Sequence, residues 1–182
     1  MQAFEQVAGV AATRRPMVTA IGVIGFAVAL AAASQIAIPL PGTPVPLTLQ
    51  PMLVVLAGLL LGPRAGAASM MLYLAAGAAG LPVFTPMGAP GLARLVGPTG
   101  GYLIAYPIAA FVAGSLGWRA ARFPRRFVAA VAGMFAIYLG GFAQLALLTG
   151  SLESAVLLGV IPFVALDVVK AFAAALVPPI RS

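Results

Sequence analysis

Residues 17–38, MVTAIGVIGFAVALAAASQIAI, form an apolar run without a charged side chain. A transmembrane helix needs about 20 such residues to cross a hydrocarbon core about 30 Å thick. The rest of the chain has the same character, since 63% of its 182 residues are hydrophobic, 7% are charged and the mean hydropathy is +1.12. Soluble domains carry about 25% charged residues. The sequence therefore predicts an all-α integral membrane protein.

Five more apolar segments follow this run along the chain. The basic start and the small residues AAAS give the first segment some features of a cleaved signal peptide, but its apolar run is long enough to span and other spans follow. No repeat or second domain is visible, so we expect one domain over residues 1–182. The six predicted transmembrane helices lie at roughly 17–38, 48–62, 66–81, 100–118, 127–149 and 155–177.

The basic residues predict how these helices are oriented. Cytoplasmic loops of membrane proteins carry an excess of Lys and Arg. Six spans with both termini in the cytoplasm leave one basic residue, Arg94, outside, while Lys170 falls within a span. The basic residues behind the net charge of +7 are then explained by the orientation of the helices in the membrane. We therefore expect no nucleic acid partner. Eight basic residues fall on the cytoplasmic side: Arg14, Arg15, Arg64, Arg119, Arg122, Arg125, Arg126 and Arg181.

The composition argues against an enzyme. The chain has no Cys and no His, which removes thiol nucleophiles, zinc sites and imidazole bases. Its three acids are Glu5, Glu153 and Asp167, and Glu5 lies in the N-terminal tail, so a carboxylate pair is hard to build. No phosphate-binding loop of the G-x-x-x-x-G-K-[ST] type is present. We expect no catalytic residues, no metal and no cofactor.

Two charges interrupt the last predicted helix. Asp167 lies near its middle, and Lys170 follows three residues later on the same face. A central charge costs about 2.5–3.5 kcal/mol on insertion scales, so it should face protein or a watery cavity. The pair could simply hold the helix in register, but a self-neutralising pair offers little net stability. We therefore favour a binding role for Asp167 and Lys170.

Arg94 could complete the same site. It lies in the irregular stretch between the third and fourth predicted helices and could either reach lipid headgroups or turn inward. If it turns inward, Arg94, Asp167 and Lys170 sum to +1, which suits a small monocarboxylate. The motif GPTGGY, residues 97–102, follows directly; Thr99 can cap the next helix, and Tyr102 offers both an apolar ring and a hydroxyl.

The loop PLPGTPVPLTLQP, residues 39–51, contains five prolines. The helix that follows is short, about 22 Å at 1.5 Å per residue, so we expect the loop to reach membrane depth. Irregular backbone is tolerated there only over protein or a cavity. We interpret the loop as a stiff flap over the site, with Gln50 at its end as a substrate contact. The flap residues are Pro39, Pro41, Gly42, Thr43, Pro44 and Pro46.

Small residues form two ladders along the first helix. Residues at this four-residue spacing let another helix approach closely. The alternatives are packing within this chain and docking of a partner protein. One ladder holds Gly25, Ala29 and Ala33, and the other holds Ala27 and Ala31.

Four motifs in series resemble one family. IPLPGTPVPLTLQ, GLPVF, GPTGGYLIAY and PFVALDVVK are similar to motifs of the BioY family, the biotin-specific substrate-binding (S) components of energy-coupling factor (ECF) vitamin transporters. The resemblance implies a multi-pass protein of the bacterial cytoplasmic membrane that captures biotin outside. It also implies docking, through helix 1, to a transmembrane scaffold subunit with two ATPases.

The resemblance also implies roles for individual residues. Asp167, Lys170 and Arg94 match ligand-binding positions, and the proline-rich loop is expected to close over the ligand. Tyr102 and Phe163 suit the apolar ring and tail of biotin. Two alternatives stay open: an S component for another vitamin, and a self-sufficient small-molecule carrier.

Overall fold

The computed structural model describes the backbone of residues 2–179 and the side chains of residues 17–179, so Arg14, Arg15, Arg181 and Glu5 lie outside the described side chains. Within this range the fold is all-helical, and an isolated bridge between Ile38 and Leu47 is its only β pairing. The helices are α1 (Gln2–Ser34), α2 (Gln50–Leu61), α3 (Pro63–Ala78), α4 (Leu92–Val96), α5 (Gly100–Gly117), α6 (Phe123–Thr149), α7 (Leu152–Gly159) and α8 (Val164–Leu176).

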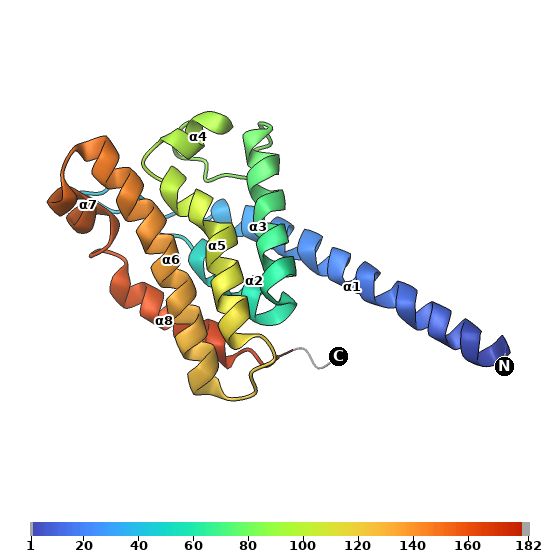
Figure 1. Ribbon diagram of the computed structural model, residues 1–182. Helices are drawn as coiled ribbons and strands as arrows, with labels where there is room; N and C mark the ends of the chain where they lie inside the picture. The colour runs from blue at the N-terminus through green and yellow to red at the C-terminus, as the bar shows by residue number, and fades with distance from the viewer. Residues whose placement is uncertain (1, 180–182) are drawn as a thin grey trace.

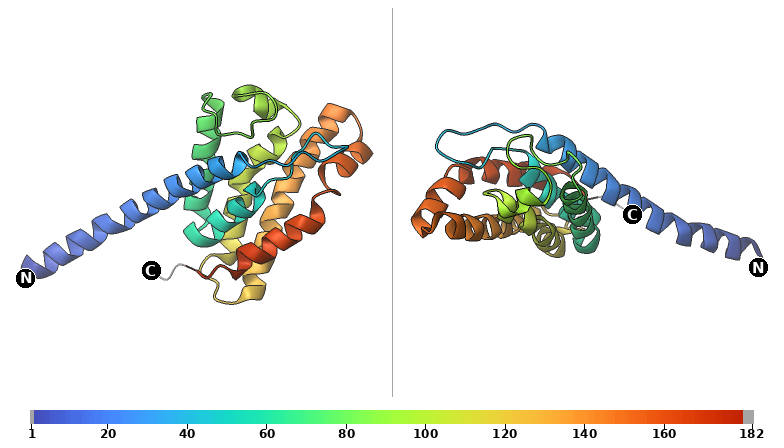
Figure 2. Two further views of the ribbon diagram at one scale, coloured as in Figure 1. Left: turned by 180° about the vertical axis from the view of Figure 1, so that it is seen from behind. Right: turned by 90° about the horizontal axis from the view of Figure 1, so that it is seen from above.

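Helix α5 is the centre of the bundle. It packs against α2, α3 and α6, while α8 lies against α6 and α2 (Figure 1). The C-terminal half of α1 packs on α2 and α3, and its N-terminal half extends away from the bundle (Figures 1 and 2). Glycines allow the closest approaches: a Cβ on Gly58 would overlap the backbone of Ala110, and one on Gly101 would overlap that of Gly140. Small residues at helix crossings are typical of membrane bundles.

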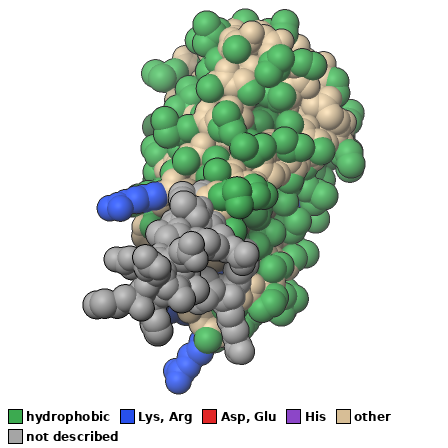
Figure 3. Space-filling view, turned by 90° about the vertical axis from the view of Figure 1, so that its right-hand side faces the viewer, with side chains coloured by type: hydrophobic (Ala, Val, Ile, Leu, Met, Phe, Trp, Pro, Cys, Tyr) green, Lys and Arg blue, Asp and Glu red, His purple; other side chains and the backbone are tan. Residues whose placement is uncertain are grey.

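In the part of the chain that the structure describes, three helical segments are long and apolar enough to cross a membrane: Met17–Ser34, Gly100–Gly117 and Phe123–Thr149. A fourth crossing is possible if α7 and α8, which meet at a bend of 53°, count as one span. Helix α2 is apolar but shorter. The outer surface suits lipid, because hydrophobic side chains cover most of the face shown in Figure 3. The fold is therefore that of a helical membrane protein, and six crossings stay a prediction.

The last predicted helix, 155–177, is not continuous. It breaks between Gly159 and Val164, so Asp167 lies in the first turn of α8. Pro162 explains the break, because it has no N–H to donate to the carbonyl four residues earlier. Thr99 is the N-cap residue of α5, as predicted, but its side chain makes no cap hydrogen bond.

Other boundaries differ by a few residues. Helix α1 ends at Ser34 rather than at residue 38, because Ile38 pairs with Leu47 across the proline-rich loop. Helix α3 begins at Pro63, which needs no N–H in the first turn of a helix.

The basic residues gather at one end of the bundle. Gly62, at the turn between α2 and α3, lies against the ring of Trp118 at the end of α5. This contact brings Arg64 to the same end as the loop between α5 and α6, with Arg119 over the Trp118 ring at 4.2 Å. Helices α4 and α7 lie at the opposite end (Figure 1).

Candidate ligand-binding site

A cavity lies at the end of the bundle opposite to the basic cluster. The loop before α2 covers it, and helices α2, α5, α6 and α8 form its walls. The volume open to the centre of a water molecule is about 60 Å³, enough for a few waters at about 10–15 Å³ each. A larger ligand therefore requires the covering loop to move. The lining residues are Val45, Pro46, Leu47, Thr48, Gln50, Pro51, Thr85, Thr99, Tyr102, Leu103, Tyr106, Ile137, Tyr138, Phe163, Asp167 and Lys170.

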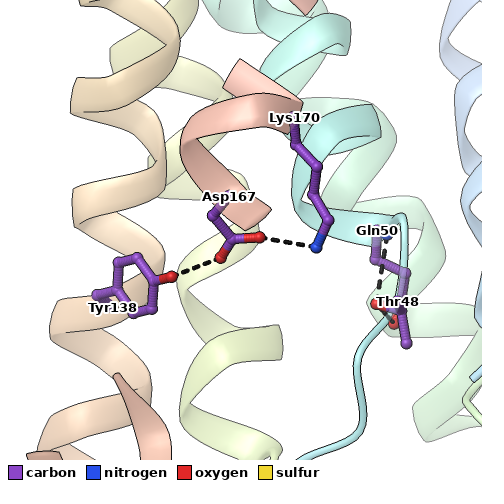
Figure 4. Close-up of polar contacts among 5 residues, drawn as sticks. All are labelled: Thr48, Gln50, Tyr138, Asp167 and Lys170. Carbon is purple, nitrogen blue, oxygen red and sulfur yellow. Dashed lines mark hydrogen bonds and ion pairs between the residues drawn. The ribbon is translucent and has the colours of Figure 1, made fainter. Parts of the chain in front are cut away.

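The charged centre of the cavity is a buried ion pair. Lys170 Nζ donates to Asp167 Oδ1 at 2.7 Å, and the two side chains are 10% and 9% exposed. The other carboxylate oxygen, Oδ2, accepts a hydrogen bond from the Tyr138 hydroxyl at 2.6 Å (Figure 4). The predicted pairing of Asp167 with Lys170 is confirmed, and α6 adds a third member.

This arrangement leaves bonding capacity for a ligand. An ammonium has three donors, of which the structure uses one, and a carboxylate has about four lone-pair sites, of which it uses two. Lys170 points toward the segment that holds Thr48 and Gln50 (Figure 4). The site can therefore donate to a carbonyl or carboxylate oxygen and accept from a ligand N–H within one small volume.

The break between α7 and α8 leaves two backbone carbonyls without a partner in their own helix. In a continuous helix, the Leu158 carbonyl would accept from residue 162, but that residue is Pro162. Thr43 Oγ1 donates to Leu158 O instead, at 2.6 Å. The next carbonyl, Gly159 O, accepts from the Tyr102 hydroxyl at 2.7 Å. Both carbonyls thus find partners outside their own helix.

The proline-rich loop crosses the molecule to reach this break. It leaves the end of α1, passes over the cavity and meets α7 before it returns to α2 (Figure 2). Gly42 has φ of 84°, a left-handed conformation that glycine adopts without strain. Thr43 Oγ1 also accepts from Val45 N at 3.1 Å, and Val45 is buried over the cavity. The loop is a cover fixed at Thr43, while Pro39, Pro41 and Pro44 are exposed and Pro46 lines the cavity.

Gln50 lines the cavity and is 3% exposed. Its Nε2 donates to the Tyr73 hydroxyl at 2.8 Å, and Thr48 Oγ1 lies 3.4 Å from its Oε1. The amide is therefore held by α3 and by the start of its own helix, so it presents a fixed group to the cavity.

Arg94 turns inward and is 6% exposed, but its guanidinium does not reach the charges of α8, and Arg94 is not among the residues that line the cavity. Its terminal nitrogens donate to the backbone carbonyls of Thr85 and Met87. The loop wraps around the guanidinium because Gly88, at φ of 108°, leaves no Cβ in its way. Burial lowers the pKa of Arg94 from its ordinary value, and the nearby Tyr73 acts in the opposite direction. Since Thr85 does line the cavity, Arg94 supports the wall from behind.

The sequence missed Tyr138, which contacts Asp167 directly. A lone tyrosine hydroxyl inside the apolar segment 127–149 was the available signal, because a buried hydroxyl normally needs a partner. The sequence also missed Thr48 as a cavity residue.

The two small-residue ladders of α1 have different surroundings in the structure. Ala27 is buried and Ala31 packs against the core cluster, so this ladder faces the chain's own helices and not a partner. Gly25 is exposed, with open space where a Cβ would lie, and Ala29 and Ala33 are half-buried.

Comparison with known proteins identifies the family of this chain. The sequence model of the BioY family matches residues 6–181. This chain belongs to the BioY family. Its similarity to the probable biotin transporter BioY of Pyrococcus horikoshii is 43% identity over 134 residues, which covers 74% of this chain and 78% of that protein. Its similarity to the biotin transporter BioY of Thermotoga maritima is 38% identity over 140 residues, covering 77% and 82%.

A solved structure supports the same family at the level of the fold. The crystal structure of the S-component for biotin from an ECF-type ABC transporter matches this BioY chain with a TM-score of 0.79. The sequence identity is 26%, and the match covers 89% of each chain. The family predicted from the four motifs is confirmed.

Proposed function

We propose that this protein is a high-affinity biotin-binding S component that captures biotin at the end of the bundle covered by the proline-rich loop. The observation that carries the proposal is the buried Asp167–Lys170 ion pair, joined by the half-buried Tyr138, in a cavity covered by that loop. The names of the BioY relatives and of the matching structure support biotin as the ligand.

The chemistry of the cavity suits biotin. The ureido ring carries two N–H donors and a carbonyl acceptor, and Asp167 and Lys170 offer the complementary acceptor and donors side by side. Among the described residues that line the cavity, Lys170 is the one cation, so it can meet either the ureido carbonyl or the acid group at the opposite end of biotin. The rings of Tyr102 and Phe163 provide apolar walls for the bicyclic ring and its tail. Arg94 acts on the ligand through the Thr85 wall.

Direct binding measurements test the ligand. We expect the purified protein to bind biotin at one site per chain and to bind thiamine and riboflavin far more weakly in parallel titrations. Asp167→Asn and Lys170→Ala should each weaken biotin binding by at least tenfold, as hydrogen bonds to charged groups are worth about 1.5–3 kcal/mol. Tight binding of thiamine or riboflavin would assign another vitamin.

A folding control is needed, because removing one member of a buried pair destabilises a protein by about 3–5 kcal/mol. The double variant Asp167→Asn with Lys170→Met removes both charges, which is often neutral for stability. It should melt near the wild-type temperature and still fail to bind biotin. A folded double variant that binds like wild type would contradict the site assignment.

We also propose six membrane crossings with both termini in the cytoplasm. The chain contains no Cys, so single-cysteine variants can be labelled without background. Glu153→Cys should react with an impermeant maleimide in intact bacterial cells, and Ala121→Cys only after the membrane is opened. Reaction of both variants in intact cells would refute this orientation.

Transport by this chain is proposed to need a scaffold subunit and two ATPases. The open face of α1 at Gly25 supports a docking role for the ladder Gly25, Ala29 and Ala33. Gly25→Leu should reduce co-purification with the scaffold while biotin binding stays intact. Biotin uptake into vesicles that contain this chain alone would favour a self-sufficient carrier.

A further inference from the structure

Arg126 is a buried cation far from the ligand cavity. It is 2% exposed, and its Nε donates to the carbonyl of Ala175 near the end of α8 at 3.2 Å. Its two terminal nitrogens, Nη1 and Nη2, are buried and have no hydrogen-bond partner. An unpaired buried guanidinium is strongly unfavourable, so this group needs a counterion.

No described carboxylate can supply the negative charge. The side chains of residues 17–179 include two carboxylates, Glu153 and Asp167. Asp167 is already bound by Lys170 and Tyr138. Glu153 follows the far end of α6, about 40 Å from Arg126 at 1.5 Å per residue. The counterion must therefore come from outside this part of the chain.

The surroundings of Arg126 attract an anion. Arg122 is the N-cap residue of α6, four residues before Arg126, and is exposed. The N-terminus of α6 adds the partial positive charge of its free backbone N–H groups. Arg119 and Arg125 are exposed nearby, and Arg125 Nε is held by the carbonyl of Leu116.

An apolar surface adjoins this basic pair. Phe123 and Phe127 lie one turn apart on α6, next to the face that carries Arg126, and their rings stack at 5.9 Å. The ring of Phe172 on α8 closes the group at 5.0 Å from Phe123 and is 48% exposed. A basic pair beside an exposed aromatic surface matches a molecule with a phosphate and a hydrocarbon chain, and basic pockets between transmembrane helices bind anionic headgroups.

We propose that Arg122 and Arg126 bind the phosphate of an anionic phospholipid, whose acyl chain lies along Phe123, Phe127 and Phe172. The Arg126 side chain makes one hydrogen bond, to Ala175 O, and its buried Nη1 and Nη2 must turn toward the surface to meet the phosphate oxygens. Arginine forms paired hydrogen bonds with such oxygens. Anionic lipid is enriched in the cytoplasmic leaflet, where the proposed orientation places this end.

Lipid retention tests the proposal. Wild-type protein, Arg126→Gln and Arg122→Gln are purified from vesicles of phosphatidylcholine with phosphatidylglycerol, and the retained lipids are counted by mass spectrometry. Wild type should retain phosphatidylglycerol and melt at a higher temperature with it than with phosphatidylcholine alone. Both variants should retain it roughly tenfold less. Arg125→Gln removes an equal charge from the same turn and should retain phosphatidylglycerol like wild type.

The proposal has clear points of failure. Arg122 is exposed, so Arg122→Gln remains informative even if Arg126→Gln folds poorly; biotin binding checks the folding of each variant. If Arg125→Gln loses as much phosphatidylglycerol as Arg122→Gln and Arg126→Gln, the loss reflects the net charge and not a site. That result would overturn the proposal. Stabilisation of wild type by inorganic phosphate in detergent, to the same extent as by the lipid, would overturn the assignment to phospholipid. Equal melting temperatures in both lipid mixtures would overturn it as well.

Discussion

The contact between Thr43 and Leu158 predicts how fast bound biotin leaves the site. Thr43 Oγ1 donates a hydrogen bond to Leu158 O at 2.6 Å. This hydrogen bond joins the proline-rich loop to α7. Thr43→Val keeps the shape of the side chain but removes the hydroxyl. A hydrogen bond of this kind contributes about 0.5–1.5 kcal/mol, and each 1.4 kcal/mol is tenfold. If the loop must open before release, Thr43→Val should release biotin about 2- to 12-fold faster.

The assay is a chase experiment. Protein loaded with labelled biotin is mixed with excess unlabelled biotin, and the label that stays bound is followed over time. Thr43→Ser is the matched control, because it keeps the hydroxyl and should release at nearly the wild-type rate. The reasoning is refuted if Thr43→Val releases at the wild-type rate, or if Thr43→Ser is as fast as Thr43→Val.

Three further predictions concern the cavity, the loop and the bundle. Tyr138→Phe removes the 2.6 Å hydrogen bond to Asp167 and should weaken biotin binding about tenfold or more in calorimetry; an unchanged affinity would mean that the phenol does not order the carboxylate. Replacing Pro44 and Pro46 together by Gly loosens the loop. The rate of biotin release should rise clearly, while the melting temperature should change little. Unchanged release would leave these prolines as spacers. Gly101→Ala places a Cβ against the backbone of Gly140 and should destabilise the fold by about 1–3 kcal/mol. Gly25→Ala meets open space and should be neutral or stabilising, so equal melting temperatures of the two variants would contradict this packing.

The sequence predicted the features that depend on composition and spacing. Apolar length indicated α1, α5 and α6, and the three-residue spacing of Asp167 and Lys170 placed both on one helix face. The structure shows the ion pair that this spacing allows, while the binding role favoured for the two residues stays a proposal.

Other features depended on contacts between distant segments, which spacing does not report. Arg94 was expected near Asp167 and Lys170 because the three charges would sum to +1, which suits a monocarboxylate, but backbone carbonyls of its own loop hold it. Tyr138 carries no charge, so an apolar pattern hides it. A proline at position 162 indicates a disturbed helix. The partner that Leu158 O then finds could not be predicted, because it is the Thr43 hydroxyl, 115 residues earlier in the chain.

The free carbonyl at the helix break has a consequence for the solvent. If the loop lifts, Leu158 O loses the Thr43 hydroxyl, and Pro162, four residues later, has no N–H to replace it. A water molecule must then hydrate that oxygen, so each opening takes up water and each closure returns it to the bulk. The equilibrium between covered and open cavity should therefore respond to osmotic stress, with excluded osmolytes favouring the covered form.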